Sequence, residues 1–404
     1  MGLQIMCLLH LARQTAGFGA DLVWISSGTL FRTAMYMGLH RDPMHLPKVP
    51  VFEAEQRRRL WGTIIELTLQ SSVESGGPPL FSTDDFDTEP PSNLDDNELE
   101  AKGPDTTTPV SKALEVYTDS SFLIAIRKSL ALRLEIAKFV NNFRSPPTFE
   151  ETLRLNAELT AACRTLTQAV NSFQKSDSRA SPFHSQLLEH IIRPFFIVLH
   201  MPFMKRAFEN PAYYFSRKMM LDSALKLYTS SCADSTLISG THVSAPNHDY
   251  ARLTICGSGP FRNIVLRAHM IIAAEVIAQL EEDEGLAPRV DLLDALRGMP
   301  VWTRRRQEAG ETNIKSHLFA TVILTYIDCL MQGLDIQQTE KAVLARGSVS
   351  LKEAIDMLQL SAGGSHLNDS SPQGETILTD NTAMLGDDWS WADLVSWLSS
   401  ATRN

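Results

Sequence analysis

Apolar residues recur every three or four positions along most of the chain. The clearest stripe passes through Leu155, Leu159, Ala162, Leu166, Val170 and Phe173. This period places apolar side chains on one face of a helix. The same spacing marks residues 1–16, 123–137, 183–199, 211–229, 261–284, 313–334 and 339–360. Because no sustained alternation and no hairpin signal occurs, the pattern predicts an all-α fold, an irregular multi-helix domain.

Two stretches depart from the helical pattern. Residues 76–108 are rich in proline, asparagine and acidic side chains, which predicts a long, acidic, partly ordered loop. Residues 361–383 are polar and rich in glycine and serine, which is typical of a flexible linker. The sequence therefore predicts a helical domain over residues 1–360, a polar linker over 361–383, and an acidic, tryptophan-rich C-terminal segment over 384–404.

The charge distribution argues against direct contact with DNA. The chain has 404 residues, of which 21% are charged and 44% are hydrophobic, and its net charge is -10. Acidic residues concentrate in residues 84–105 and 369–404, and no basic domain balances them. Because binding to DNA depends on cationic side chains that neutralise phosphates, we do not expect these residues to supply it.

The cysteines and the longest apolar run exclude two further classes of protein. The cysteines are far apart and never form a Cys-x-x-Cys pair: Cys7, Cys163, Cys232, Cys256 and Cys329. Neither a disulfide framework nor a zinc cluster has that spacing. The apolar run over residues 318–331 is shorter than the roughly 20 residues that cross a membrane. We therefore expect no metal, no cofactor and no membrane span in this chain.

Motifs that carry catalysis are missing. Neither Gly-x-x-x-x-Gly-Lys nor Gly-x-Gly-x-x-Gly occurs, and residues 257–259 lack the spacing of a nucleophile elbow. His40 and His45 are close together, but a metal site needs three or four converging ligands. His200 ends an apolar segment, where an imidazole can cap free helix carbonyls. We predict that the chain is not an enzyme; the alternative that stays open is a helical enzyme or small-molecule-binding protein.

Three consecutive arginines, Arg57, Arg58 and Arg59, suggest a nucleic-acid surface at first sight. On a helix, however, consecutive residues point about 100° apart, so the three cannot form one binding face. Glu53 lies four residues before Arg57, and Glu55 lies three residues before Arg58 and four before Arg59. We therefore predict structural ion pairs of Arg57 with Glu53, and of Arg58 or Arg59 with Glu55.

The C-terminal segment combines aromatic and acidic side chains. Its candidate partner-binding residues are Trp389, Trp391, Leu394, Trp397 and Leu398. Aromatic residues with acidic neighbours are typical of a segment that folds into the apolar groove of a partner. Two interpretations stay open: an activation-type segment that binds a partner, and a terminal helix that docks on its own domain.

Several short motifs follow one another in a defined order. They are Gly38-Leu39-His40, Arg57-Arg58-Arg59-Leu60-Trp61, Gly77-Pro78 and Leu199-His200-Met201-Pro202-Phe203. This order and spacing resemble the regulatory domain of fungal zinc binuclear-cluster transcription factors, often called the middle homology region. The resemblance covers about residues 3–208.

The motif residues have roles in folding that can be stated physically. Gly38 is expected to end the helix over residues 27–37 in a left-handed conformation. Trp61 is expected to anchor the next helix in the core. Gly77 and Pro78 are expected to direct the chain into an extended exit. The resemblance therefore implies a scaffold and no catalytic site.

The family resemblance also implies a function and partners. It implies a nuclear regulator of RNA polymerase II genes, for a metabolic or secondary-metabolite pathway, with transcriptional coregulators or related factors as partners and with a small-molecule effector. Zinc is expected only in the six-cysteine cluster that precedes this domain in the family, and these residues do not contain that cluster. Three explanations stay open: part of a longer protein, a regulator without its own DNA contact, and an inactive remnant.

Overall fold

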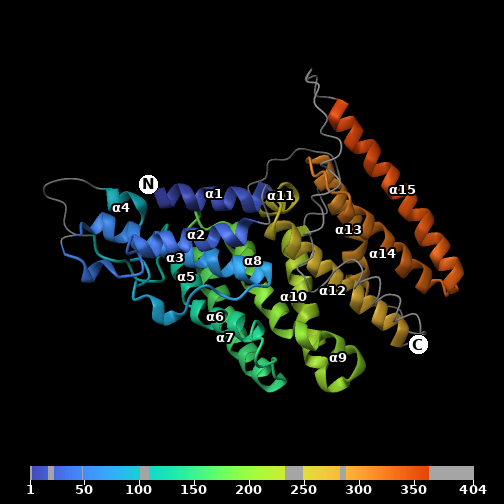
Figure 1. Cartoon of the computed structure of the whole chain (residues 1–404), viewed down its shortest axis with the longest axis horizontal. Helices are drawn as coiled ribbons and strands as arrows, with labels where there is room; N and C mark the ends of the chain where they lie inside the picture. Colours follow the sequence, from blue (N-terminus) through green and yellow to red (C-terminus); the bar gives the residue numbers. More distant parts are fainter. Residues whose placement is uncertain are drawn as a thin grey trace. The chain divides into compact units, whose positions relative to one another are not determined.

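The computed structural model describes residues 2–16, 22–47, 49–100, 109–232, 249–282 and 288–363 (Figure 1). Within these ranges the regular elements are helices and no strand occurs, which confirms the all-α prediction. The chain divides into two compact units, which we call the first and the second unit. The first consists of Met1–Val73 with Gly77–Ala268, and the second of Glu74–Gly76 with His269–Asn404. A single domain over residues 1–360 stays a prediction.

The described part of the first unit is built from short and long helices. They are α1 (Gly2–Ala16), α2 (Val23–Tyr36), most of α3 (Val51–Ser75), α4 (Asp96–Glu100), α5 (Ser121–Arg127), α6 (Leu130–Val140), α7 (Phe149–Ser176), α8 (Pro182–His200), α9 (Met204–Glu209), α10 (Tyr214–Cys232), α11 (Asp249–Cys256) and the start of α12 (Pro260–Glu282). Single 3-10 turns join some of them: η2 (Pro43–His45), η3 (Thr83–Asp85), η4 (Met201–Phe203) and η5 (Pro211–Tyr213).

Helix α7 shows how the sequence produces such an element. Thr148 precedes the helix in an extended conformation, and its hydroxyl accepts a hydrogen bond from the backbone N–H of Glu151 at 3.4 Å. That contact satisfies one of the free N–H groups of the first turn. The stripe predicted between Leu155 and Phe173 faces the core, and every member except Ala162 is buried. The helix is therefore held mainly by its apolar face.

The core of the first unit lies around α3 and α8. Trp61 on α3 and Phe195 on α8 are each 1% exposed. Helix α8 packs against α6, α7, α10 and α11. The same buried cluster takes side chains from α1 and α2, among them Leu3 and Phe31. The motif residues are therefore attached to the main hydrophobic core of this unit.

The described part of the second unit contains the larger part of α12, from His269 onward, and three helices that pack against one another (Figure 1). They are α13 (Val290–Glu308), α14 (Lys315–Met331) and α15 (Ile336–Gly363). The sequence analysis did not predict α13, because Gly298 and Pro300 interrupt its apolar stripe. The helix nevertheless runs through Pro300 and buries Leu292 and Trp302.

The remaining sequence predictions differ from the structure in detail. The stripe over residues 123–137 is divided, since α5 ends at Arg127 and α6 begins at Leu130. The described part of the predicted loop over residues 76–108 contains η3 and α4. Residues 361–363 of the predicted linker extend α15, whereas 364–404 lie outside the described residues.

Two helical stretches are long and apolar enough to cross a membrane: Pro182–Glu209 and Pro260–Glu282. The sequence analysis did not single them out. Of their most apolar windows, 72% and 61% are buried inside the protein. Such burial is typical of helices in a protein core, and the absence of a membrane span stays a prediction.

Candidate functional site

Gly38, Leu39 and Arg57 close the end of α2. Gly38 has a φ of 72°, a left-handed conformation that favours glycine. Leu39 is 2% exposed. The Arg57 guanidinium donates hydrogen bonds to the carbonyl oxygens of Met37 at 3.2 Å and Gly38 at 2.8 Å. Because Arg57 forms no ion pair with any described residue, the predicted pair with Glu53 is wrong, and the arginine caps α2 instead.

Arg58 joins two buried carboxylates, and we call Asp42, Glu55 and Arg58 the α3 charge cluster. The Arg58 guanidinium lies 2.7 Å from Asp42 Oδ1 and 2.7 Å from Glu55 Oε1. Burial alone would raise the pKa of Asp42, but hydrogen bonds from Arg58 and from the backbone N–H groups of Met44 and Glu89 lower it to about 2. The carboxylate is therefore ionised at neutral pH. The contact with Glu55 is one of the predicted pairs.

The α3 charge cluster also holds the proline-rich loop. The backbone N–H of Glu89 donates to Asp42 Oδ2 at 3.0 Å, and that of Ser92 donates to Glu55 Oε2 at 2.7 Å. Thr88 is 2% exposed, and its hydroxyl donates a hydrogen bond to the carbonyl of Leu39 at 2.6 Å. Each carboxylate thus connects α3 with a loop segment that lies more than thirty residues later in the sequence.

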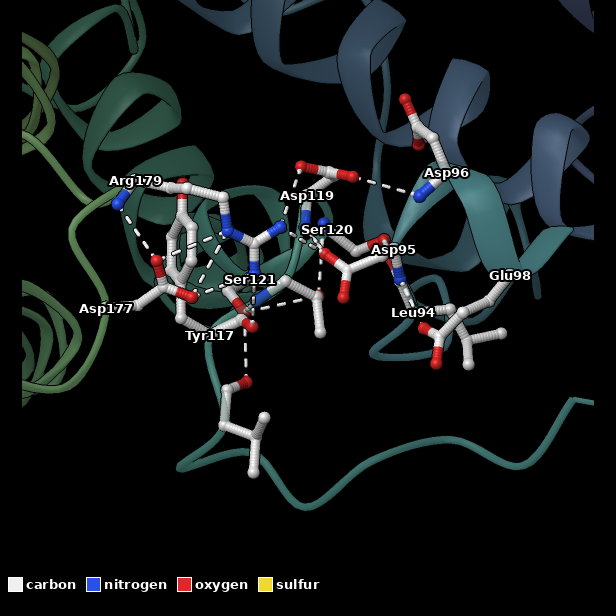
Figure 2. Close-up of polar contacts among 12 residues, drawn as sticks. Leu94, Asp95, Asp96, Glu98, Tyr117, Asp119, Ser120, Ser121, Asp177 and Arg179 are labelled. Carbon is white, nitrogen blue, oxygen red and sulfur yellow. Dashed lines mark hydrogen bonds and ion pairs between the residues drawn. The ribbon is translucent and has the colours of Figure 1, made fainter. Parts of the chain in front are cut away.

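Figure 2 shows a second set of ion pairs, which is centred on Asp95. Arg179 Nη1 and Lys112 Nζ each lie 2.8 Å from an oxygen of its carboxylate. Burial raises the pKa of Asp95. The hydrogen bonds from Lys112 and Arg179 lower it by more than burial raises it, so the pKa lies below its ordinary value. Arg179 also pairs with Asp177 and lies over the ring of Tyr117 (Figure 2). This set joins segments 84 residues apart.

Arg59, the third arginine of the motif, contacts a segment that neither Arg57 nor Arg58 contacts. It donates to the carbonyl oxygen of Leu94 at 2.8 Å and pairs with Asp96. It therefore does not pair with Glu55. The three arginines serve three different partners, the end of α2, the α3 charge cluster and the start of α4, and they form no common basic surface.

Trp61 is the centre of an aromatic cluster. Its ring centroid lies 5.6 Å from those of Phe31 and Phe86, and 6.4 Å from that of His40. Phe31 stacks in turn on Phe81 at 5.4 Å. The cluster joins α2 and α3 to the loop that follows η3, so the loop is fixed by apolar contacts as well as by charge.

Gly77 contacts α2, and Pro78 contacts α3. A Cβ atom at Gly77 would be 3.0 to 3.1 Å from atoms of the Trp24 indole, so a side chain there would require the indole to shift. The carbonyl of Pro78 accepts a hydrogen bond from the Ser72 hydroxyl at 3.4 Å. The exit of the chain from α3 is therefore set by close packing.

The predicted role of His200 is wrong. Its Nδ1 lies 2.9 Å from Ser216 Oγ and its Nε2 lies 3.1 Å from Asn156 Oδ1, so the ring points to α10 and α7 and not to free carbonyls. Burial lowers the pKa of His200 to about 4, which keeps the ring neutral at pH 7. Pro202 lies at the start of η4, where a missing N–H is tolerated.

The sequence analysis missed a buried ion pair between Glu66 and Arg133. The two guanidinium nitrogens of Arg133 donate to the two oxygens of Glu66 at 2.6 and 2.7 Å, and Arg133 is 0% exposed. Burial raises the pKa of Glu66, but the attraction and hydrogen bonds of Arg133 outweigh it and lower the pKa. The available signal was a carboxylate within the apolar run of residues 64–67. Its partner lies 67 residues away, which only the fold reveals.

The ionisable groups of this site contact one another and leave little reactive chemistry. Among the described residues, no group of three or more His, Cys, Asp or Glu side chains could hold a metal ion. The candidate partner-binding residues Trp389, Trp391, Leu394, Trp397 and Leu398 lie outside the described residues. What the arrangement does is join α2, α3, the proline-rich loop and the end of α7 through hydrogen bonds and ion pairs.

Comparison with known proteins identifies the class. Residues 3–187 match the fungal specific transcription factor domain. The transcription factor lepE of Aspergillus flavus is 39% identical over 282 residues, which are 70% of this chain and 32% of lepE. The transcription factor opdR of Penicillium oxalicum is 34% identical over 396 residues, which are 90% of this chain and 48% of opdR.

A third relative carries a more specific name. The aspyridones cluster regulator apdR of Emericella nidulans is 34% identical over 321 residues, which are 77% of this chain and 43% of apdR. The chain thus spans between a third and a half of the length of these relatives. No solved structure matches the chain.

Proposed function

We propose that this chain is the regulatory part of a nuclear transcriptional regulator of RNA polymerase II genes, and that these genes belong to a secondary-metabolite pathway. The observation that carries the proposal is the 34% identity with the transcription factor opdR over 90% of the chain. The name of apdR, a cluster regulator, supports the class of pathway. Coregulators or related factors are the proposed partners, and direct contact with DNA is not assigned to these residues.

The geometry of the site supports regulation over catalysis. Asp42, Glu55, Asp95 and Glu66 all have arginine or lysine partners, so each side chain contributes to folding. A general acid or base would instead need a free group with a pKa near the working pH. A scaffold with satisfied charges is suited to presenting surfaces to other proteins.

The proposal is tested by raising the level of the chain in the fungus that carries its gene and sequencing the transcripts. We expect a coordinated change in the transcripts of one set of neighbouring biosynthetic genes, and a fluorescent fusion in the nucleus. The control is a Glu66→Ala chain, whose weakened fold is expected to reduce the effect. Unchanged transcripts at a verified level of folded chain would contradict the proposal.

We further propose that residues 384–404 form an activation-type segment. Its composition, with Trp391 and Trp397 among acidic residues, supports this interpretation. The chain fused to an unrelated DNA-binding domain is expected to raise a reporter, and Trp391→Ala with Trp397→Ala is expected to abolish the increase. Phe143→Ala, at a position that is 94% exposed, is the matched control and should change nothing. Equal output from all three chains would exclude the activation role.

A further inference from the structure

Helix α1 has two apolar faces, and only one of them is buried. Leu3 and Cys7 face the core and are 3% and 6% exposed. On another face, Ile5, Leu8 and Leu9 are 57%, 66% and 48% exposed. Their spacing of three and four residues places these three side chains in one row along the helix.

Helix α2 repeats the arrangement. Val23, Leu30 and Phe31 are buried, whereas Leu22 and Ile25 are 47% and 61% exposed. Because α2 packs along α1 within the first unit (Figure 1), a groove lies between the two helices. Leu9 of α1 lines it together with Leu22 and Ile25, whereas Ile5 and Leu8 do not. A soluble surface seldom keeps two adjacent apolar rows unless something binds there.

The groove between α1 and α2 has a neutral floor. Its volume is about 250 Å³, and its lining includes Leu9, Leu22 and Ile25. His10 lies beneath it, with Nδ1 3.2 Å from Ser26 Oγ and Nε2 3.2 Å from Ser71 Oγ. Burial, with the nearby Arg13, lowers the pKa of His10 to about 4, so the floor carries no charge at pH 7.

The charged side chains on α1 and α2 have one sign. Neither α1 nor α2 contains an aspartate or glutamate. Arg13 lines the groove, and Arg32 follows Ile25 by seven residues on the same side of α2. Neither arginine forms an ion pair with a residue that the structure describes. The groove therefore offers two free cations beside its apolar rows.

We propose that the groove between α1 and α2 is the docking site for an acidic amphipathic helix of a partner protein. Large apolar side chains at i, i+3 or i+4, and i+7 would insert between the two rows. Carboxylates at the margin of that helix would pair with Arg13 and Arg32. The inference names the surface through which the proposed regulator engages a coregulator, and in that respect it rests on the proposed function.

Charge favours this occupant over a second copy of the chain. A two-fold interface would place the same patch on itself. Arg13 and Arg32 would then meet the arginines of the other copy with no carboxylate on either helix to balance them. An acidic helix instead satisfies both the apolar rows and the two cations.

The test measures binding of labelled peptides to the whole chain by fluorescence anisotropy. The probe is a peptide of about twenty residues with leucines at helical spacing and glutamates beside them, and its matched control has lysine in place of glutamate. We expect the glutamate peptide to bind at least about tenfold more tightly at low salt. Leu9→Asp and Ile25→Asp should each weaken it about tenfold, while Phe143→Asp, at an exposed site elsewhere in the first unit, should not.

The charge reversal makes the test specific. The double variant Arg13→Glu with Arg32→Glu should reverse the preference and bind the lysine peptide more tightly, and circular dichroism verifies that each variant is folded. Equal binding of the two peptides, or binding that Leu9→Asp does not change, would overturn the proposal. So would a dimer in sedimentation that Ile25→Asp makes monomeric. Peptide binding without any transcriptional effect would reject the proposed function and leave the docking site standing.

Discussion

Replacing Glu66 by alanine would leave the Arg133 guanidinium buried and charged without its partner. Arg133 is 0% exposed, and its remaining contacts are the hydroxyl of Ser129, the carbonyl of Ile126 and the ring of Phe195. Loss of one partner from a buried ion pair costs about 3 to 5 kcal/mol. We therefore expect Glu66→Ala to lower the free energy of unfolding by that amount, measured by urea titration with circular dichroism.

The double variant is the control for this buried pair. Glu66→Leu with Arg133→Met removes both charges and keeps much of the volume, so its loss of stability should be clearly smaller. If the single and double variants lost the same free energy of unfolding, the loss would come from the changed side-chain shape and not from the unpaired charge.

Asp42 makes stability depend on acid pH. Its pKa in the folded chain is about 2, below the value of about 3.9 expected for an unfolded aspartate. The unfolded chain therefore takes up a proton first, and the stability that Asp42 contributes above pH 4 is lost as pH falls towards 2. The shift corresponds to about 2.5 kcal/mol. Asp42→Asn should lower the free energy of unfolding at pH 7 by about that amount and flatten its fall between pH 4 and 2.

At the scale of elements, Gly38 determines how α2 ends. Its φ of 72° is costly for any residue with a Cβ atom, so Gly38→Ala should lower the free energy of unfolding by about 1 kcal/mol. Gly347 is the matched control, because it lies within α15 and an added Cβ would meet Val322 at an ordinary 3.6 Å. Gly347→Ala should leave stability unchanged or raise it by up to about 1 kcal/mol. Thermal unfolding of the two variants compares them, and a loss at both positions would contradict the backbone argument.

The elements also show what a sequence can reveal. The stripe from Leu155 to Phe173 predicted α7, because helix periodicity is local. Pro300 concealed α13, because the local cost of a proline was offset by packing that only the tertiary structure supplies. The site was less predictable, since Arg57 and His200 lie at the expected positions but contact a carbonyl or a hydroxyl from another element. Side-chain partners depend on distances across the fold, which spacing along the chain does not encode.

At the scale of the first unit, polar contacts join segments that are far apart in the sequence. Arg179 connects α7's end to Asp95, and Asp42 connects the turn after α2 to the loop at Glu89. Because each contact holds two such segments to each other, we expect the segments to lose structure together and not one by one.

Three buried histidines give the first unit a second dependence on pH, above that of Asp42. Burial lowers the pKa values of His10, His190 and His200 to about 4, with Arg13 adding to the effect at His10. An unfolded histidine has a pKa of about 6.5, so the unfolded chain binds protons in this window and the folded chain does not. Stability is therefore complete above about pH 6.5 and falls as pH decreases to 4, by about 2 kcal/mol for each histidine at pH 5.

The histidine prediction is checked by urea titration at a series of pH values between 7 and 4. His200→Gln should remove about a third of the decline, because the other two histidines still titrate. Glutamine can keep one of the hydrogen bonds to Asn156 and Ser216, so the variant should remain folded at pH 7. The window separates this effect from that of Asp42, whose contribution is lost only below pH 4. A stability profile that stays flat from pH 6.5 to 5 would show that these rings accept protons in the folded chain, and their hydroxyl and amide partners would then have to rearrange.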